Sequence, residues 1–197
     1  MPGPLEHEPI RGFTGKIPVR GDFVHAGLPR DFTDPWHDWQ ASVIAASREI
    51  MHEHWLDAFL EAPVWRFALA PGLCGKRAVV GLMLPSVDRV GRYFPLTFAA
   101  LPDGGTPSPA IWSAWLDQAE ALGRLALDED APPEQLMPPP CPTLSGAETL
   151  GVEIGDGIWW TEGGPRVAPV RLILPALPDG ARFASMLGHI APVESTP

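Results

Sequence analysis

Residues 78–84 read Ala-Val-Val-Gly-Leu-Met-Leu, and this continuous apolar run is the stretch of the sequence that decides the fold. A short run without alternation is typical of a strand that is buried on both faces, in a sheet that helices cover on two sides. The chain then passes through a charged segment, residues 85–95, and residues 96–101 again have the composition of a strand. The local order is therefore strand, charged loop, strand.

Apolar periodicity predicts further elements on both sides of this segment. Residues 64–70 alternate apolar side chains with Arg66, as a strand does. A helix is predicted after Thr33 or Asp34, with Pro35 at its first position, because apolar residues then recur at intervals of three and four. Strands are also predicted at residues 12–17, 158–161 and 167–174, and helices at residues 55–61, 109–126 and 179–187. This mixed order of elements favours a layered α/β domain.

Length and composition indicate a single domain with short tails. A chain of 197 residues can bury a large core without disulfides or metals. We assign residues 12–190 to one α/β domain, residues 1–11 to a flexible N-terminal tail and residues 191–197 to a frayed C-terminus. Residues 128–147 are rich in proline and predict an extended surface loop within that domain.

Charge and hydropathy exclude several classes of protein. Hydrophobic residues make up 45% of the chain and charged residues 19%, which is too apolar for a disordered protein. The net charge of −10 opposes binding to nucleic acid or to an anionic membrane surface. No run approaches 18 apolar residues, and the first ten residues lack the basic and apolar regions of a signal peptide. We therefore expect a cytoplasmic protein without membrane insertion.

No segment meets the requirements of a known cofactor or metal site. Neither Gly12–Ile17 nor Gly72–Lys76 has the spacing of a phosphate-binding loop that opens a helix. The two histidines of His52–His54 are two residues apart, whereas a helical zinc site places its histidines four apart. Cys74 and Cys141 belong to no Cys-x-x-Cys pair. We therefore expect no cofactor and no metal.

Two polar segments, Gly15–Phe23 and Pro85–Leu96, hold the charged residues that are most suited to form a site. If the segments meet in the fold, their aspartate and arginine side chains would pair and fix the geometry of both loops. The same arginines, if exposed beside aromatic residues, would instead anchor a partner protein. Both interpretations stay open, and they can hold together. The candidate residues are Lys16, Arg20, Asp22, Ser86, Asp88, Arg89 and Arg92.

These segments also resemble the signature segments of a known family. Residues 15–23, residues 62–67 (Ala-Pro-Val-Trp-Arg-Phe) and residues 85–96 (Pro-Ser-Val-Asp-Arg-Val-Gly-Arg-Tyr-Phe-Pro-Leu) are similar to those of the TagF family, also called ImpM, of bacterial type VI secretion accessory proteins. The resemblance runs in order from about residue 12 to residue 101 and is weaker from Ser108 onward. It implies a three-layer α/β/α sandwich, whose central sheet we expect to be mixed, with about five or six strands.

The resemblance also implies a function. TagF proteins are associated with post-translational repression of type VI secretion through the forkhead-associated-domain scaffold protein of the system, and no enzymatic activity is attached to the domain. We therefore expect a non-enzymatic regulator that binds this scaffold, and a homo-oligomer is compatible with that role. The alternatives are a structural component of the assembled apparatus and a hydrolase that uses Ser86, Asp88 and Arg92, although Ser86 lacks a Gly-x-Ser-x-Gly elbow.

Overall fold

The computed structural model describes residues 9–102, 108–128, 131–142 and 155–188. Their strands form one seven-stranded sheet in the order β2-β1-β5-β4-β3-β6-β7, and every neighbouring pair is antiparallel. The strands are β1 (Ile10–Gly15), β2 (Val24–Ala26), β3 (Trp65–Leu69), β4 (Val79–Leu84), β5 (Leu96–Leu101), β6 (Gly157–Thr161) and β7 (Val170–Leu174). The predicted α/β class is thus confirmed, but the sheet has seven antiparallel strands, and the expectation of a mixed sheet with five or six was wrong.

Strand β4 lies in the middle of this sheet, as the apolar run at residues 78–84 predicted. Hairpin connections join it to β3 and to β5, and such connections return the chain in the opposite direction, so the sheet is antiparallel here. Val80 pairs with Ala68 of β3 on one side and with Ala100 of β5 on the other. Every residue of β4 is buried. The strand that sequence reasoning missed is β2, whose three residues follow the first polar segment.

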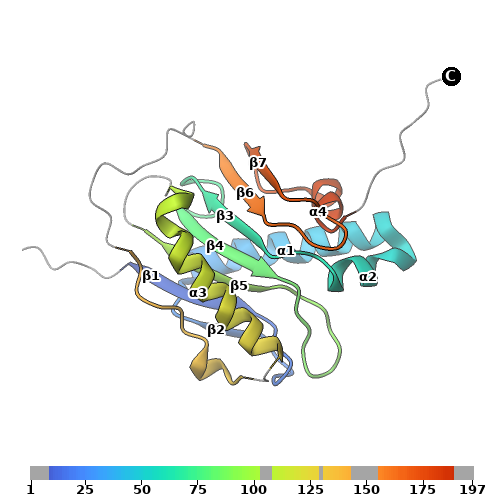
Figure 1. The fold of residues 1–197 in the computed structure, drawn as a ribbon, viewed down its shortest axis with the longest axis horizontal. Coiled ribbons are helices and arrows are strands. Elements are labelled where there is room, and N and C mark those ends of the chain that lie inside the picture. Colours follow the sequence, from blue (N-terminus) through green and yellow to red (C-terminus); the bar gives the residue numbers. More distant parts are fainter. Residues whose placement is uncertain (1–8, 103–107, 129–130, 143–154, 189–197) are drawn as a thin grey trace, which may run out of the picture.

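Three helices cover one face of the sheet: α1 (Arg30–Met51), α2 (Trp55–Leu60) and α4 (Gly180–Met186) (Figure 1). The fully buried Trp36 of α1 lies at the centre of their core, because its ring is 4.7 Å from Phe67 of β3 and 6.1 Å from Trp159 of β6, between ring centroids. A 3-10 turn, His52–His54, separates α1 from α2. Burial of these aromatic rings supplies a large apolar contribution to the stability of this side.

Helix α1 begins earlier than the sequence predicted, and Thr33 and Asp34 do not cap it. The residue before the helix is Pro29, in an extended conformation, and Pro35 lies inside the helix. The earlier start places Phe32 in the core, with its ring centroid 5.5 Å from that of Trp36. Burial of this ring offsets the backbone hydrogen bond that Pro35 cannot donate.

The opposite face of the sheet carries α3 (Pro109–Asp128), which lies in front of the sheet in Figure 1. The predicted start at Pro109 is confirmed, and the amide of Ile111 donates a hydrogen bond to the carbonyl of Ser108 over 3.1 Å. The buried face of α3 packs against β4 and β5. The molecule therefore has two apolar cores, one on each face of the sheet, which together make three layers.

The proline-rich segment packs against α3 wherever the structure describes it. Leu136 is fully buried in the α3 core, and a 3-10 turn, Pro133–Gln135, precedes it. The indole Nε1 of Trp115 donates to the carbonyl of Pro139 over 2.9 Å. Residues 131–142 are therefore part of the packed domain, although the sequence predicted a surface loop over 128–147. Residues 129–130 and 143–147 of that loop lie outside the described residues.

Strand β1 begins two residues before the predicted N-terminal boundary of the domain. β1 begins at Ile10, which pairs with Leu101 of β5, so residues 10 and 11 belong to the sheet rather than to a tail. Residues 1–8 of the predicted tail and the predicted frayed end at 191–197 lie outside the described residues. Within the part of the chain that the structure describes, no helix is both long and apolar enough to cross a bilayer.

Candidate functional site

The two polar segments meet at one end of the sheet. β1 and β4 both run antiparallel to β5, which lies between them, so they point in the same direction and end on the same side. The first polar loop, residues 16–23, follows β1, and the second polar loop, residues 85–95, joins β4 to β5 (Figure 1). The topology thus brings together two loops that lie about 70 residues apart in sequence.

Asp88 lies at the centre of the contact between the loops. Its Oδ2 atom accepts hydrogen bonds from Nζ of Lys16 over 2.5 Å and from Nε of Arg92 over 2.7 Å. The side chain of Asp88 is fully buried, and that of Lys16 is 6% exposed. A buried carboxylate is stable only when it is paired in this way, so the ion pair with Lys16 ties the second loop to the first.

The other oxygen of Asp88 fixes the shape of the second loop. Its Oδ1 atom accepts hydrogen bonds from the amides of Val90 and Arg92 over 3.0 and 2.9 Å. The amide of Gly91 donates to the carbonyl of Asp88. Gly91 has a φ of 84°, a backbone conformation that residues other than glycine rarely adopt. A tight turn centred on one aspartate is the result, and it explains why Asp and Gly are spaced three apart in this segment.

The same contacts set the charge of Asp88. Burial by itself raises the pKa of the carboxyl group. The hydrogen bonds from Lys16, from Arg92 and from the amide of Val90 lower the pKa by more than burial raises it, so the pKa of Asp88 lies well below its usual range. Asp88 is therefore ionised throughout the physiological pH range. Its negative charge is paired with the positive charges of Lys16 and Arg92.

Three further contacts join the loops through the backbone. The hydroxyl of Ser86 donates to the carbonyl of Lys16 over 2.6 Å, and the amide of Arg89 donates to the carbonyl of Arg20 over 3.0 Å. The guanidinium of Arg92 also donates to the carbonyl of Gly21. Ser86 is buried and its hydroxyl proton is occupied, so this residue is not placed to act as the nucleophile of a hydrolase.

The remaining candidates lie on the surface around this buried centre. Arg20, Asp22 and Arg89 are exposed, and the side chain of Arg92 is 58% exposed. Arg89 has no hydrogen bond or ion pair through its side chain within the described residues. The seven predicted residues therefore divide into a buried structural set (Lys16, Ser86 and Asp88) and an exposed set that surrounds it (Arg20, Asp22, Arg89 and Arg92).

The site also includes Phe23 and Phe94, which are aromatic residues of the two polar segments, and His37 and Glu134, which sequence reasoning missed. Phe23 packs edge-on against Phe94, with ring centroids 4.8 Å apart, and against His37 of α1 over 4.6 Å. Nζ of Lys16 lies 4.6 Å from the centroid of the Phe23 ring. Glu134, from the proline-rich segment, lies 3.7 Å from the guanidinium of Arg20. No local pattern relates His37 and Glu134 to the two polar segments, because the fold alone brings them together.

Comparisons with known proteins identify the family. The family model described as the TagF N-terminal domain, type VI secretion system-associated, matches residues 12–138, which include both polar loops. The chain belongs to the TagF family. The fold is similar to the crystal structure of PA0076 from Pseudomonas aeruginosa PAO1, with 36% sequence identity, a TM-score of 0.77, and coverage of 93% of this chain and 97% of that chain. No curated protein sequence matches this chain.

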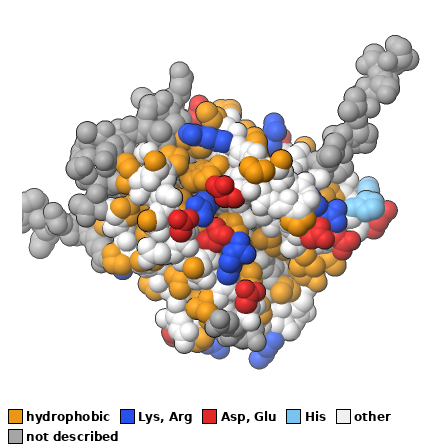
Figure 2. Space-filling view, viewed as in Figure 1, with side chains coloured by type: hydrophobic (Ala, Val, Ile, Leu, Met, Phe, Trp, Pro, Cys, Tyr) orange, Lys and Arg blue, Asp and Glu red, His pale blue; other side chains and the backbone are white. Residues whose placement is uncertain are grey.

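The TagF segment at residues 62–67 carries a second charged cluster, on the α3 face. Arg66 of β3 donates to Asp117 over 2.8 Å and to Glu120 over 2.9 Å, and Glu120 also accepts from Arg124. Burial lowers the pKa of Arg66, but the two carboxylates raise it by more, so the pKa of Arg66 lies above its usual value. Burial raises the pKa of Glu120, but Arg66 and Arg124 lower it by more, so the pKa of Glu120 lies below its usual value. Figure 2 shows acidic and basic side chains side by side over the middle of this face. The cluster fastens α3 to the sheet.

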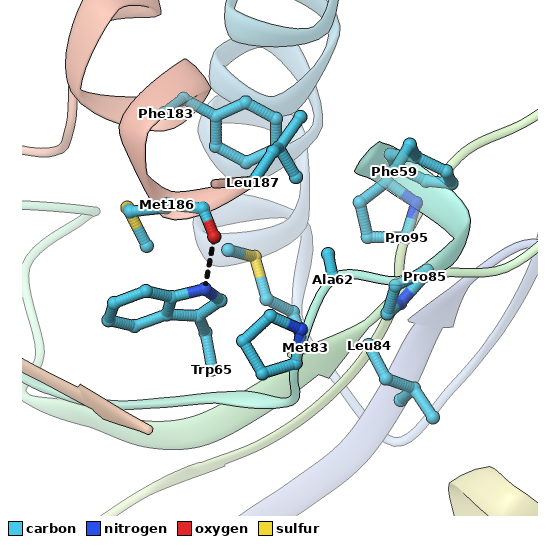
Figure 3. A pocket seen from close by; sticks show the side chains of 11 residues that line it. Phe59, Ala62, Trp65, Met83, Leu84, Pro85, Pro95, Phe183, Met186 and Leu187 are labelled. Carbon is cyan, nitrogen blue, oxygen red and sulfur yellow. Dashed lines mark hydrogen bonds between the residues drawn. The ribbon is translucent and has the colours of Figure 1, made fainter. Parts of the chain in front are cut away.

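The same TagF segments line a small apolar cavity of about 20 Å³ at the base of the second loop. In Figure 3 its wall is formed by Trp65, Met83, Pro85 and Pro95, with α2 and α4 above them, and Nε1 of Trp65 donates to the carbonyl of Met186 over 3.0 Å. A volume of this size holds about one water molecule, and a nearly apolar wall does not favour one. The cavity is therefore a packing space that seats the loop, and it is too small for an organic ligand.

The histidine segment His52–His54 immediately precedes Trp55, whose ring centroid lies 6.3 Å from that of Tyr93 in the second polar loop. Both histidines are exposed, on the turn between α1 and α2. Among the described residues, no group of three or more potential ligands lies close enough together to hold a metal ion.

Proposed function

We propose that this protein is a non-enzymatic accessory factor of type VI secretion that binds the forkhead-associated-domain scaffold protein and so represses assembly. Membership of a type VI secretion-associated family supports an accessory role. Binding of a scaffold represses assembly by mass action alone, since each bound scaffold molecule is withdrawn from the machine. No chemical step is required.

The observation that carries this proposal is the exposed arginine Arg89 on a rigid loop. The buried Asp88 holds the second loop in one shape, so its exposed side chains lose little conformational freedom when a partner binds. Arg89 has no ion-pair partner within the described residues, while the neighbouring Val90 is 64% exposed. Arginine beside an apolar side chain is typical of the residues that dominate protein interfaces.

Binding of the purified scaffold protein to this chain, measured by isothermal titration calorimetry, tests the proposal. Arg89→Glu should weaken binding about tenfold or more, because a reversed charge at a central anchor leaves both partners unpaired. The matched control is Arg77→Glu, since Arg77 is also exposed but lies in the turn between β3 and β4, at the opposite end of β4. This variant should bind as the wild type does.

Two results would contradict the proposal. One is an absence of binding between the purified proteins, and the other is equal affinity for the Arg89→Glu and Arg77→Glu variants. A pull-down from the native host separates the alternative of a structural component. If the chain copurifies with sheath or baseplate proteins and without the scaffold, it belongs to the assembled apparatus.

A further inference from the structure

The two edges of the sheet differ in how they are protected. At one edge β2 has only three residues, and so short a strand offers little for another strand to pair with. At the other edge β7 has five residues and, among the described strands, pairs only with β6. The described part of the chain makes no other backbone hydrogen bond to residues 170–174. Within the described residues, the outer side of β7 is therefore an open row of amides and carbonyls.

The side chains of β7 do not protect this edge. Native sheets usually keep an open edge from pairing by charged side chains, bulges or a proline within the strand. β7 reads Val-Arg-Leu-Ile-Leu and has one charge, Arg171. Ile173 is 59% exposed and Val170 is 38% exposed. An edge of this composition pairs readily with another strand.

The sequence around β7 is symmetric about Leu172. Pro169 precedes the strand and Pro175 follows it, so a proline stands at the same distance from Leu172 on either side. An antiparallel copy of β7, placed so that Leu172 faces Leu172, therefore pairs Val170 with Leu174 and Arg171 with Ile173. Both prolines then lie just outside the ladder, where a missing amide donor costs nothing.

We propose that β7 joins two copies of this chain through a two-fold axis at Leu172, which extends the sheet without interruption from one copy into the other. The axis keeps each face of the sheet continuous. Leu172 and Leu174 pack against the α1 core, so they would form one apolar row with Val170 on that side of both copies. Arg171 and Ile173 lie on the α3 side.

Other registers fit less well. A register centred on Arg171 sets two arginines directly opposite each other, which is destabilising, and it leaves part of the strand unpaired. A register centred on Ile173 places Arg171 opposite Pro175, which has no amide hydrogen to donate. The register centred on Leu172 pairs all five residues and sets no like charges opposite each other. A second copy is therefore the occupant that this edge fits by its own sequence.

Charge variants at Ile173 test both the dimer and its register. Ile173 is exposed. In the proposed dimer, Ile173 of each copy would lie opposite Arg171 of the other copy, so the dimer contains this pair twice. In Ile173→Lys each pair becomes two like charges, and in Ile173→Glu each pair becomes an attractive one. We expect the wild type to sediment as a dimer of its 21.3 kDa chain, and the Lys variant to dissociate about tenfold or more readily than the Glu variant.

The order of the two variants makes the test specific. General repulsion between acidic chains predicts that the Glu variant dissociates more readily. Ile173→Lys makes the net charge less negative, whereas Ile173→Glu makes it more negative. The double variant Arg171→Glu with Ile173→Lys should restore the dimer. Circular dichroism checks that each variant is folded.

A wild type that sediments as a monomer at every attainable concentration would overturn the inference, as would equal dissociation of the Lys and Glu variants or no rescue in the double variant. The measurement uses the protein by itself, so it succeeds or fails independently of scaffold binding.

Discussion

Nζ of Lys16 lies 2.5 Å from Oδ2 of Asp88, and this buried ion pair spans 72 residues of sequence. The two side chains come from different loops, so the contact is available only after β1, β5 and β4 have assembled side by side. The pair therefore links formation of the sheet to the shape of the surface that we propose for scaffold binding.

Loss of the carboxylate should destabilise the fold. Asp88→Asn leaves the ammonium group of Lys16 buried without a negative partner, and removal of one member of a buried pair costs about 3 kcal/mol. Urea unfolding should show this loss in the free energy of unfolding. The control is Asp22→Asn, because Asp22 is exposed on the first loop and has no ion pair within the described residues. Equal stability of Asp88→Asn and wild type would show that the pair contributes nothing to the fold.

The stability that Asp88 contributes should depend on pH. Its pKa is lower in the folded protein than the value of about 4 that it has in an unfolded chain. The unfolded state therefore binds the proton first, and the contribution of Asp88 is complete above about pH 4 and is lost as the pH falls further.

Unfolding measured at several pH values between neutral and strongly acidic conditions isolates this effect. Below about pH 4 the free energy of unfolding of the wild type should fall more steeply than that of Asp88→Asn, by at most about 1.4 kcal/mol per pH unit. Parallel slopes for the wild type and Asp88→Asn would mean that Asp88 titrates alike in both states.

The cluster on the α3 face should be almost as important for stability. Arg66→Met removes both hydrogen bonds to α3 and leaves the partly buried Glu120 with Arg124 alone, a loss of roughly 2 kcal/mol. Arg124→Met removes an exposed pair within one helix and should change the stability by less than about 0.5 kcal/mol. Thermal unfolding of the two variants measures the difference. Equal effects would place Arg66 among the ordinary surface residues.

Local sequence patterns predicted most elements, because burial imposes a period that can be read along the chain. The apolar run at residues 78–84 indicated a central strand, and Pro109 indicated the start of α3. Periodicity does not encode which strands pair, so the antiparallel order of the sheet was not available from it. β2 was not predicted, because three residues are too few to show the alternation of apolar and polar side chains that marks a strand.

The candidate site was predicted in part from the positions of its charged residues. The concentration of Asp and Arg in two segments pointed to their pairing, and Lys16, Asp88 and Arg92 do meet. What the pattern did not contain is the burial of each residue, so it did not separate the structural Asp88 from the exposed Arg89. Glu134 comes from the distant proline-rich segment and reaches Arg20 only through packing on α3.

The thiol of Cys74 reports on opening of the α1 core. Burial raises the pKa of Cys74 to about 12, and its Sγ lies against the carbonyl of Phe32 at the start of α1. In a Cys141→Ser background, reaction of the native protein with a disulfide reagent at pH 8 should be much slower than reaction of the denatured protein, because the Cys74 thiol is buried and is protonated at this pH. Addition of Asp88→Asn should accelerate the reaction, since a less stable fold opens more often. A fast reaction of the native protein that Asp88→Asn leaves unchanged would show that Cys74 is reached without opening of the core.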